Sequence, residues 1–132
     1  MNIKVRYYSR SGNTKSLAEA IAKGANVTAI SVDANNSEIK ENTDVLFIGG
    51  ALYAYGLDKH LKQYLDELDG SKINKAVVFS TSWISKHSID LIKNSLTKKG
   101  IKVEENYCYA KSKPTESDLK EAESFAKKVL EG

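Results

Sequence analysis

Residues 8–17, with the sequence YSRSGNTKSL, place hydroxyl side chains around one glycine, between the first apolar segment and the first helical segment. The residues of this turn are Ser9, Arg10, Ser11, Gly12, Asn13 and Thr14. N–H groups at the start of a helix attract anions, glycine lets the backbone approach a ligand closely, and hydroxyls add further donors. Phosphate, with several acceptor oxygens, fits this set better than a carboxylate does. The alternative, a simple helix cap by Ser11 or Asn13, explains only one of these side chains.

Several other phosphate-binding motifs are absent. The nucleotide-binding pattern G-x-x-x-x-G-K-S/T does not occur, and no G-x-G-x-x-G follows an expected strand. A cysteine phosphatase would need its nucleophile in this turn, whereas the single cysteine is Cys108. A phospho-accepting receiver domain would need an aspartate at the end of the third strand, where the sequence has Gly49-Gly50. The turn therefore predicts a phosphate-binding loop of another kind.

The turn opens a regular alternation of apolar strands and amphipathic helices. Strands are expected at residues 3–7, 27–32, 45–48, 76–79 and 101–109, and helices at 14–23, 57–68, 89–96 and from 114 onwards. Gly24 and Gly100 are expected to end two of the helices, and Thr115 and Asp118 to form a capping box at the last. Residues 33–43 leave room for little more than one helical turn.

This order predicts a single α/β domain spanning residues 1–132, with a parallel sheet, right-handed crossovers and helices on both faces. The unbroken apolar runs 45–48 and 76–79 are typical of strands covered on both faces. In such sheets ligands bind beyond the carboxyl ends of the strands. The loops where we expect a ligand are therefore residues 9–14, 49–56, 80–86 and 108–113.

Composition limits the classes of protein that the chain can represent. With 132 residues, 41% of them hydrophobic and 28% charged, it resembles one soluble globular domain. No apolar run could span a membrane, the N-terminus shows no signal-peptide core, and one cysteine fits a reducing compartment, so we expect a cytoplasmic protein. The net charge of +3 comes from scattered lysines, without the aromatic-interleaved basic patch of nucleic-acid binders.

The remaining titratable residues do not form a reactive constellation. Cys108 is expected to be a structural thiol, and His60 and His87 to be solvated. No cluster has metal-ligand spacing. Arg10 flanks the phosphate loop and is expected to point to solvent, whereas Arg6, if it lies within the sheet layer, needs a carboxylate partner.

The segment Ser9-Arg-Ser-Gly-Asn-Thr14 resembles the flavodoxin signature S/T-x-S/T-G-x-T and stands at that family's usual place after the first strand. The likeness extends over the whole chain and is greatest to short-chain flavodoxins and related small flavodoxin-domain proteins, because the fifth strand carries no long insertion. It implies a three-layer flavodoxin-like fold with a five-stranded parallel sheet of order 2-1-3-4-5. It also implies that the loop holds the phosphate of FMN.

The resemblance assigns the flavin ring to the loops after the third and fourth strands, where flavodoxins commonly hold it between aromatic side chains. Tyr53, Tyr55 and Trp83 occupy these loops, and Tyr53 is slightly favoured over Tyr55 for stacking. Flavodoxins also turn a peptide carbonyl toward the reduced ring, and Tyr55-Gly56 is the natural place because glycine tolerates positive φ; alternatively the glycine serves the turn. The implied cofactor-binding residues are Ser9, Arg10, Ser11, Gly12, Asn13, Thr14, Leu52, Tyr53, Ala54, Tyr55, Gly56, Thr81, Ser82 and Trp83.

The resemblance implies an electron carrier whose FMN passes single electrons between redox partner proteins. Two alternatives stay open: a small FMN-dependent oxidoreductase linked to quinones or protoporphyrinogen, and a non-flavin module of the same fold that binds another phosphate ligand. No catalytic residue and no metal site are assigned, and we expect a monomer that neither binds nucleic acid nor inserts into membranes. Flavodoxins are commonly acidic, so this basic chain has either different partners or partners that are themselves acidic.

Overall fold

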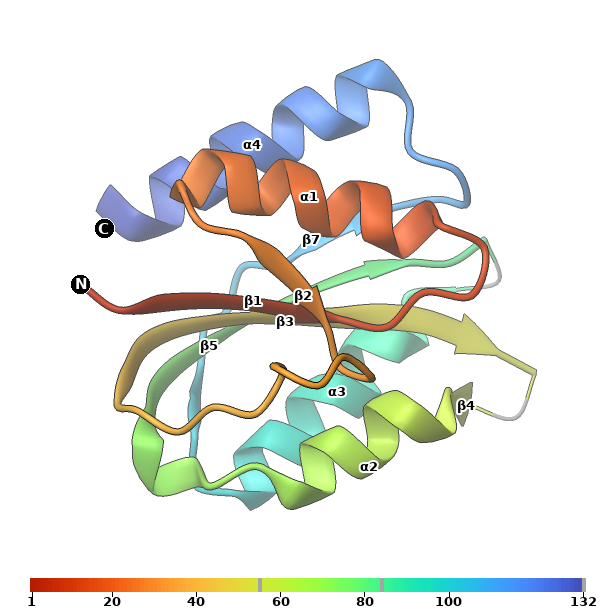
Figure 1. Cartoon of the computed structure of the whole chain (residues 1–132). Coiled ribbons are helices and arrows are strands. Elements are labelled where there is room, and N and C mark those ends of the chain that lie inside the picture. Colours follow the sequence, from red (N-terminus) through yellow and green to blue (C-terminus); the bar gives the residue numbers. More distant parts are fainter. Residues whose placement is uncertain (55, 84, 132) are drawn as a thin grey trace.

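The structure is a computed structural model that describes residues 1–54, 56–83 and 85–131. Figure 1 shows one sheet lying between two layers of helices. In chain order the elements are β1 (Ile3–Tyr7), α1 (Asn13–Ala25), β2 (Ala29–Ser31), β3 (Thr43–Tyr53), β4 (Gly56–Leu57), α2 (Lys59–Glu67), a 3₁₀ turn (Gly70–Lys72), β5 (Ile73–Thr81), α3 (His87–Lys98), β6 (Lys102–Val103), β7 (Cys108–Ala110) and α4 (Glu116–Glu131).

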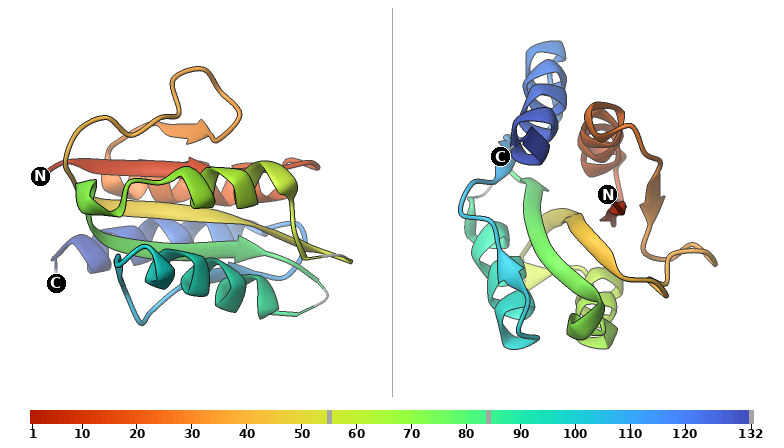
Figure 2. Two further views of the ribbon diagram at one scale, coloured as in Figure 1. Left: turned by 90° about the horizontal axis from the view of Figure 1, so that it is seen from below. Right: turned by 90° about the vertical axis from the view of Figure 1, so that its left-hand side faces the viewer.

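The sheet has the predicted flavodoxin-like topology. β1 pairs in parallel with β2 on one side and β3 on the other, β5 follows β3, and β6 and β7 both pair in parallel with β5. With β6 and β7 taken as one interrupted edge strand, the order is the predicted 2-1-3-4-5. A difference is β4, which pairs antiparallel with the end of β3. Helices α1 and α4 cover one face and α2 and α3 the other, as both views of Figure 2 confirm.

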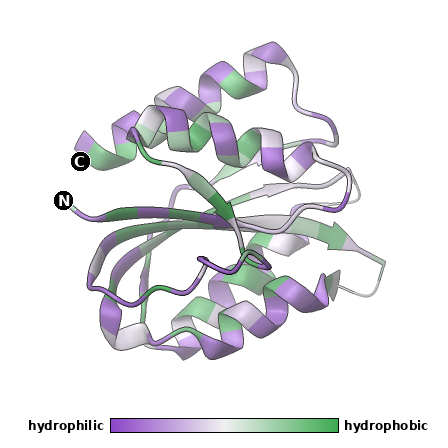
Figure 3. Cartoon of the chain, in the orientation of Figure 1, coloured by the Kyte–Doolittle hydropathy of each residue, from purple (hydrophilic) through white to green (hydrophobic). Residues whose placement is uncertain are grey.

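Alternating residues of the central strands supply two cores, one on each face of the sheet. Val45 and Phe47 of β3 pack with α1 and α4, whereas Leu46 and Ile48 pack with α2 and α3. None of these four side chains is more than 6% exposed. A strand buried on both faces must be apolar at every position, which explains the unbroken run at residues 45–48. Figure 3 shows the same contrast, with hydrophobic residues along the strands and mixed stripes on the helices.

The predicted fifth strand, residues 101–109, is wrong as one continuous element. Residues 104–107 lie between β6 and β7 without strand structure. Three polar residues, Glu104, Glu105 and Asn106, interrupt the apolar pattern here. The N–H of Glu104 still donates to the carbonyl oxygen of Ala76 in β5 (2.8 Å), and Lys93 of α3 donates to the carbonyl oxygen of Glu105 (2.9 Å).

The predicted end of the first helix at Gly24 is also wrong. Gly24 lies inside α1, which ends at Ala25 and is followed by the capping residue Asn26, with a left-handed φ of 58°. Glycine is needed at position 24 because a Cβ there would lie 2.3 Å from the carbonyl oxygen of Glu123 in α4. The residue therefore permits close packing of two helices and does not cap one of them.

The predicted ends of two other helices are confirmed. The N–H of Thr115 donates to Asp118 Oδ2 (2.9 Å) and the N–H of Asp118 donates to Thr115 Oγ1 (3.1 Å), which is a capping box at the start of α4. Gly100 follows α3 with a φ of +76°, the left-handed geometry that glycine adopts readily after a helix.

The irregular segment 33–42 supplies a hydrogen-bond acceptor for the buried Arg6 of β1. The segment forms turns, bends and irregular chain, and it contains no helix, although its length leaves room for about one helical turn. Arg6 is 3% exposed in β1, and its Nε donates to the carbonyl oxygen of Ser37 (2.8 Å) while Nη1 donates to that of Val5 (3.2 Å). Among the described residues the expected carboxylate partner is therefore replaced by two main-chain carbonyls, one from the irregular segment and one from β1 itself.

Candidate functional site

The loops that follow β1, β3, β5 and β7 meet at one end of the sheet, opposite the two termini in Figure 1. They enclose a pocket of about 290 Å³. Its lining residues are Ser9, Ser11, Asn13, Thr14, Ala51, Leu52, Tyr53, Ala54, Thr81, Ser82, Trp83 and Ser112. Most of the predicted site residues are thus brought together, from three separate loops. Arg10, Gly12 and Gly56 lie near it without lining it, and Tyr55 lies outside the described residues.

The loop after β1 places a glycine directly before the first turn of α1. The residue that precedes α1 is Gly12, which has a φ of +95° and no side chain with which to cap the helix. Gly12 therefore leaves the first turn of α1 without a side-chain cap at the N-cap position, and the one contact from Ser11 is a long hydrogen bond from the N–H of Asn13 to Ser11 Oγ (3.5 Å). Ser9 Oγ accepts the N–H of Gly12 (3.0 Å), and a hydroxyl that accepts still has its own proton to donate.

Thr14, expected to offer a hydroxyl to the phosphate, lines the pocket and also makes a buried contact. It is 1% exposed, and its Oγ1 lies 2.5 Å from Oγ1 of Thr81 at the end of β5. The two hydroxyls share one hydrogen bond between the loops that follow β1 and β5. Thr14 therefore fixes the spacing of two walls of the pocket in addition to facing it.

Because of this pairing, removing the hydroxyl of Thr14 should affect folding stability more than removing that of Ser11. Thr14→Ala leaves the buried hydroxyl of Thr81 without this partner, so we expect the unfolding free energy of the ligand-free protein to fall by about 1–3 kcal/mol. Ser11 is exposed, and Ser11→Ala serves as the control, with an expected change below about 0.5 kcal/mol. Urea denaturation of both variants measures the difference. Equal stability of Thr14→Ala and Ser11→Ala contradicts the assigned pairing.

Arg10 is exposed, as predicted, but its guanidinium group is bound to other side chains of the protein. Its Nη2 lies 2.6 Å from Asp58 Oδ2, to which Nε also donates (2.8 Å), and its guanidinium carbon lies 3.9 Å from the ring centroid of Tyr53. Asp58 is 3% exposed and caps α2 by accepting the N–H of His60 (2.7 Å). His60 is likewise not simply solvated, because its ring stacks on Tyr8 at 4.6 Å. Arg10 thus ties the phosphate loop to α2 and covers one face of Tyr53.

The charge of the Asp58 carboxylate should make the unfolding free energy depend on pH. Burial raises the pKa of Asp58, but hydrogen bonds from His60 and Arg10 outweigh burial and hold this pKa below its usual value. A carboxyl with a lowered pKa stabilises the fold above its unfolded-state pKa and loses that contribution as the pH falls.

We therefore expect Asp58→Asn to lower the unfolding free energy at pH 7 by about 1–3 kcal/mol. The difference from wild type should shrink as the pH falls below about 4, where the carboxyl of the unfolded chain becomes protonated, and should continue to shrink until the folded protein is protonated as well. Denaturant titrations at several pH values test this expectation. A difference that stays constant from neutral pH to pH 3 contradicts the assigned role of the charge.

Two aromatic side chains that could flank a planar ligand line the pocket. Tyr53 comes from the end of β3, and Trp83 follows β5 and is 73% exposed. The Trp83 loop is held against the neighbouring strand, because Ser82 donates its N–H to the carbonyl oxygen of Ala110 (3.2 Å) and accepts from Tyr109 at its own carbonyl. Gly56 has a φ of +110°. It lies in the short β4 and pairs with Tyr53 at the end of β3.

The sequence offers no signal for two of the lining residues. Ala51 extends β3 beyond the predicted strand, and Ser112 follows β7 with a φ of +63°. The loop 108–113 is predicted to approach the site, but a serine in left-handed geometry has no sequence signature that would single it out.

Cys108 and the metal-binding residue types do not form a second candidate site among the described residues. Burial raises the pKa of the Cys108 thiol to about 12, with smaller contributions from Glu121 and Asp118, which agrees with a structural role. In the described parts of the chain, no group of His, Cys, Asp and Glu is placed to hold a metal ion. Within the same ranges, no helix has the length and apolar character needed to cross a membrane.

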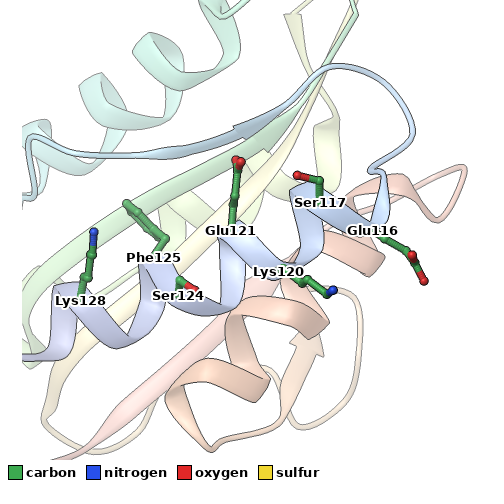
Figure 4. Close-up of a pocket in the computed structure, with 7 residues that line it drawn as sticks. All are labelled: Glu116, Ser117, Lys120, Glu121, Ser124, Phe125 and Lys128. Atoms are coloured by element: carbon green, nitrogen blue, oxygen red, sulfur yellow. The ribbon is translucent and has the colours of Figure 1, made fainter.

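A larger hollow lies on the outer face of α4, as Figure 4 shows. Its residues are Glu116, Ser117, Lys120, Glu121, Ser124, Phe125 and Lys128, all from one helix. No loop at the carboxyl ends of the strands contributes to it, and its charged side chains alternate in sign along the helix. It is a solvated helix surface, and the smaller pocket at the strand ends is the functional candidate.

The fold and the placement of the pocket define a class of protein: a doubly wound α/β domain with its ligand site at the carboxyl ends of the strands. Comparison with solved structures makes the class narrower. A flavodoxin from the domain Archaea superposes with a TM-score of 0.87 at 28% identity, covering 99% of this chain and 97% of the other. Oxidised flavodoxin 1 from Bacillus cereus superposes with a TM-score of 0.82 at 20% identity, covering 99% and 98%. The chain has the flavodoxin fold.

Sequence comparison adds one relative and no family model. No protein-family model matches the chain. An uncharacterized protein of Methanocaldococcus jannaschii is 28% identical over 137 aligned positions, which cover 89% of this chain and 90% of the relative. The two chains therefore correspond over nearly their whole length.

Proposed function

We propose that this protein binds FMN in the pocket at the strand ends and carries single electrons between redox partner proteins. One observation carries the proposal. The glycine-initiated, hydroxyl-rich start of α1 and the aromatic side chains Tyr53 and Trp83 line the same pocket. A phosphate cradle facing two flat aromatic surfaces matches a ligand with one phosphate and one planar ring system. The likeness to flavodoxin structures supports FMN as this ligand.

Different residues of the chain bind the phosphate and the ring of FMN. Ser9, Ser11 and the N–H groups at the start of α1 hold the phosphate, because hydrogen bonds to a charged oxygen are strong. Tyr53 and Trp83 flank the ring, and Arg10 supports Tyr53 from its other side. FMN supplies the redox chemistry when it is bound, whereas the protein supplies its orientation and electrostatic surroundings.

Stepwise reduction distinguishes a carrier from an oxidoreductase. We expect the FMN-loaded protein, reduced anaerobically in small steps, to take up its two electrons at two separated potentials, with absorbance above 550 nm passing through a maximum at about half reduction. It should not oxidise a nicotinamide or a quinol at a significant rate. A single two-electron step, together with direct oxidation of either substrate, contradicts the carrier and favours the oxidoreductase alternative.

A further inference from the structure

The charges around the mouth of the pocket are of one sign. The segments 8–12, 82–86 and 111–115 contain Arg10, Lys86, Lys111 and Lys113 and no Asp or Glu. Arg10 is neutralised by Asp58, as described above. The other three residues, here called the rim lysines, are exposed and form no ion pair with a carboxylate in the described part of the chain. The next acidic residues along the chain are Glu116 and Asp118, and Asp118 is engaged in the capping box.

The rim lysines lie beside an exposed aromatic surface. Trp83 and Ser112 both line the pocket, and Lys111 and Lys113 flank Ser112 in the sequence. Lys86 is held next to the Trp83 loop: its Nζ lies 5.3 Å from the ring centroid of Tyr109, whose hydroxyl bonds to Ser82. Trp83 is 73% exposed, which is unusual for a tryptophan, and exposed tryptophan is enriched where proteins meet.

We propose that Trp83 and the rim lysines form the docking face for an acidic electron-transfer protein, and this inference rests on the proposed FMN site. Charge complementarity selects the partner, because three unpaired cations raise the local concentration of a negatively charged surface and repel a positive one. Trp83 supplies the apolar centre that the complex buries. Two copies of this chain do not pair through this face, since like charges would meet. The partner's acidic patch thus lies over the mouth of the FMN pocket.

Electron transfer to two haem proteins of opposite charge tests the proposal. The FMN-loaded protein, reduced photochemically, is mixed by stopped flow with the acidic soluble domain of a microsomal b-type cytochrome or with basic mitochondrial cytochrome c. In each reaction one electron leaves the reduced protein and converts ferric haem to ferrous haem. We expect the second-order rate constant with the acidic acceptor to fall as salt is added, and that with the basic acceptor to rise, because salt screens attraction and repulsion alike.

Charge variants test whether the rim lysines cause the salt dependence of the electron-transfer rate. Neutralising the rim by the triple change Lys86→Gln, Lys111→Gln and Lys113→Gln should slow reduction of the acidic acceptor about tenfold at low ionic strength and flatten its salt dependence. The matched control, Lys98→Gln, Lys102→Gln and Lys128→Gln, removes the same charge from exposed positions outside these loops and should have little effect. Because Trp83 also lines the FMN pocket, Trp83→Ser is compared at equal FMN occupancy, where it should slow the reaction even at high salt.

The outcomes separate this inference from the function on which it rests. An FMN-loaded protein whose rate with the acidic acceptor rises with salt, or is insensitive to the rim variant, overturns the docking face and leaves the carrier function standing. A protein that binds duplex DNA or anionic vesicles through the rim lysines, with no preference for the acidic haem protein, also overturns it. Failure to bind FMN, seen in the absorption spectrum of the same sample, overturns both.

Discussion

Gly12→Val should weaken FMN binding at least about tenfold, because it acts on the loop geometry that the phosphate site requires. Gly12 has a φ of +95°, which a β-branched residue adopts only with strain, typically about 1–2 kcal/mol. A Cβ at this position meets no protein atom within 4 Å. The side chain itself therefore fits the ligand-free protein, and the expected loss comes from backbone strain and from occupation of the cradle. Fluorescence titration with FMN measures the affinity.

Gly100→Val is the matched control for this experiment. Gly100 also has a positive φ, +76°, and a Cβ there likewise meets nothing within 4 Å. It follows α3, and it does not line the pocket. The two variants should lose comparable folding stability, but only Gly12→Val should lose affinity for FMN. Equal FMN affinities in the two folded variants contradict the assignment of residues 9–14 as the phosphate loop.

The second large effect is expected for Gly56→Val. The resemblance to flavodoxins implies a peptide turn at Tyr55-Gly56 on reduction, and valine at position 56 would then disfavour only the reduced protein. Gly56 has a φ of +110° in the structure, a geometry that valine adopts only with strain. Valine should therefore cost about 1–2 kcal/mol in every redox state, shifting the short β4 and the adjoining Tyr53. We expect FMN affinity to fall about tenfold and the separation of the two reduction potentials to change as well.

Gly56→Asn separates backbone conformation from side-chain bulk. Asparagine enters left-handed geometry more easily than other non-glycine residues, so it should recover part of the affinity that valine loses. Potentiometric titration and FMN binding are measured on both variants. Wild-type behaviour in Gly56→Val means that the positive φ of residue 56 has no part in holding the pocket.

The fold was predictable because its elements depend on local patterns. Unbroken apolar runs identify the central strands, and Leu61 with Leu65, like Ile92 with Leu96, identify buried helix faces at a spacing of four residues. The wrong boundaries arose where tertiary contacts override local preference. Gly24 has the sequence character of a helix end, yet it is retained inside α1 because α4 packs against its backbone.

The site was predictable to the extent that it depends on loop composition. The hydroxyl and aromatic residues predicted at the strand ends line one pocket, since the carboxyl ends of parallel strands share an edge, whereas Gly12 and Gly56 lie beside it. The partners of Arg10 and Thr14 were not predictable. Arg10–Asp58 and Thr14–Thr81 join positions far apart in the sequence, and only the packing of loops against α2 and β5 brings them together.

The central claim is that the pocket holds FMN by its phosphate, and titration of the ligand-free protein with three flavins tests it most directly. FMN, riboflavin and FAD share the ring and differ in the phosphate end. We predict tight binding of FMN, with riboflavin weaker by about 100-fold, since the loss of two hydrogen bonds to a charged group is worth about 3 kcal/mol. FAD should also bind more weakly, because one cradle cannot hold two phosphates. Equal affinity for riboflavin and FMN, or no binding of any flavin, contradicts the account.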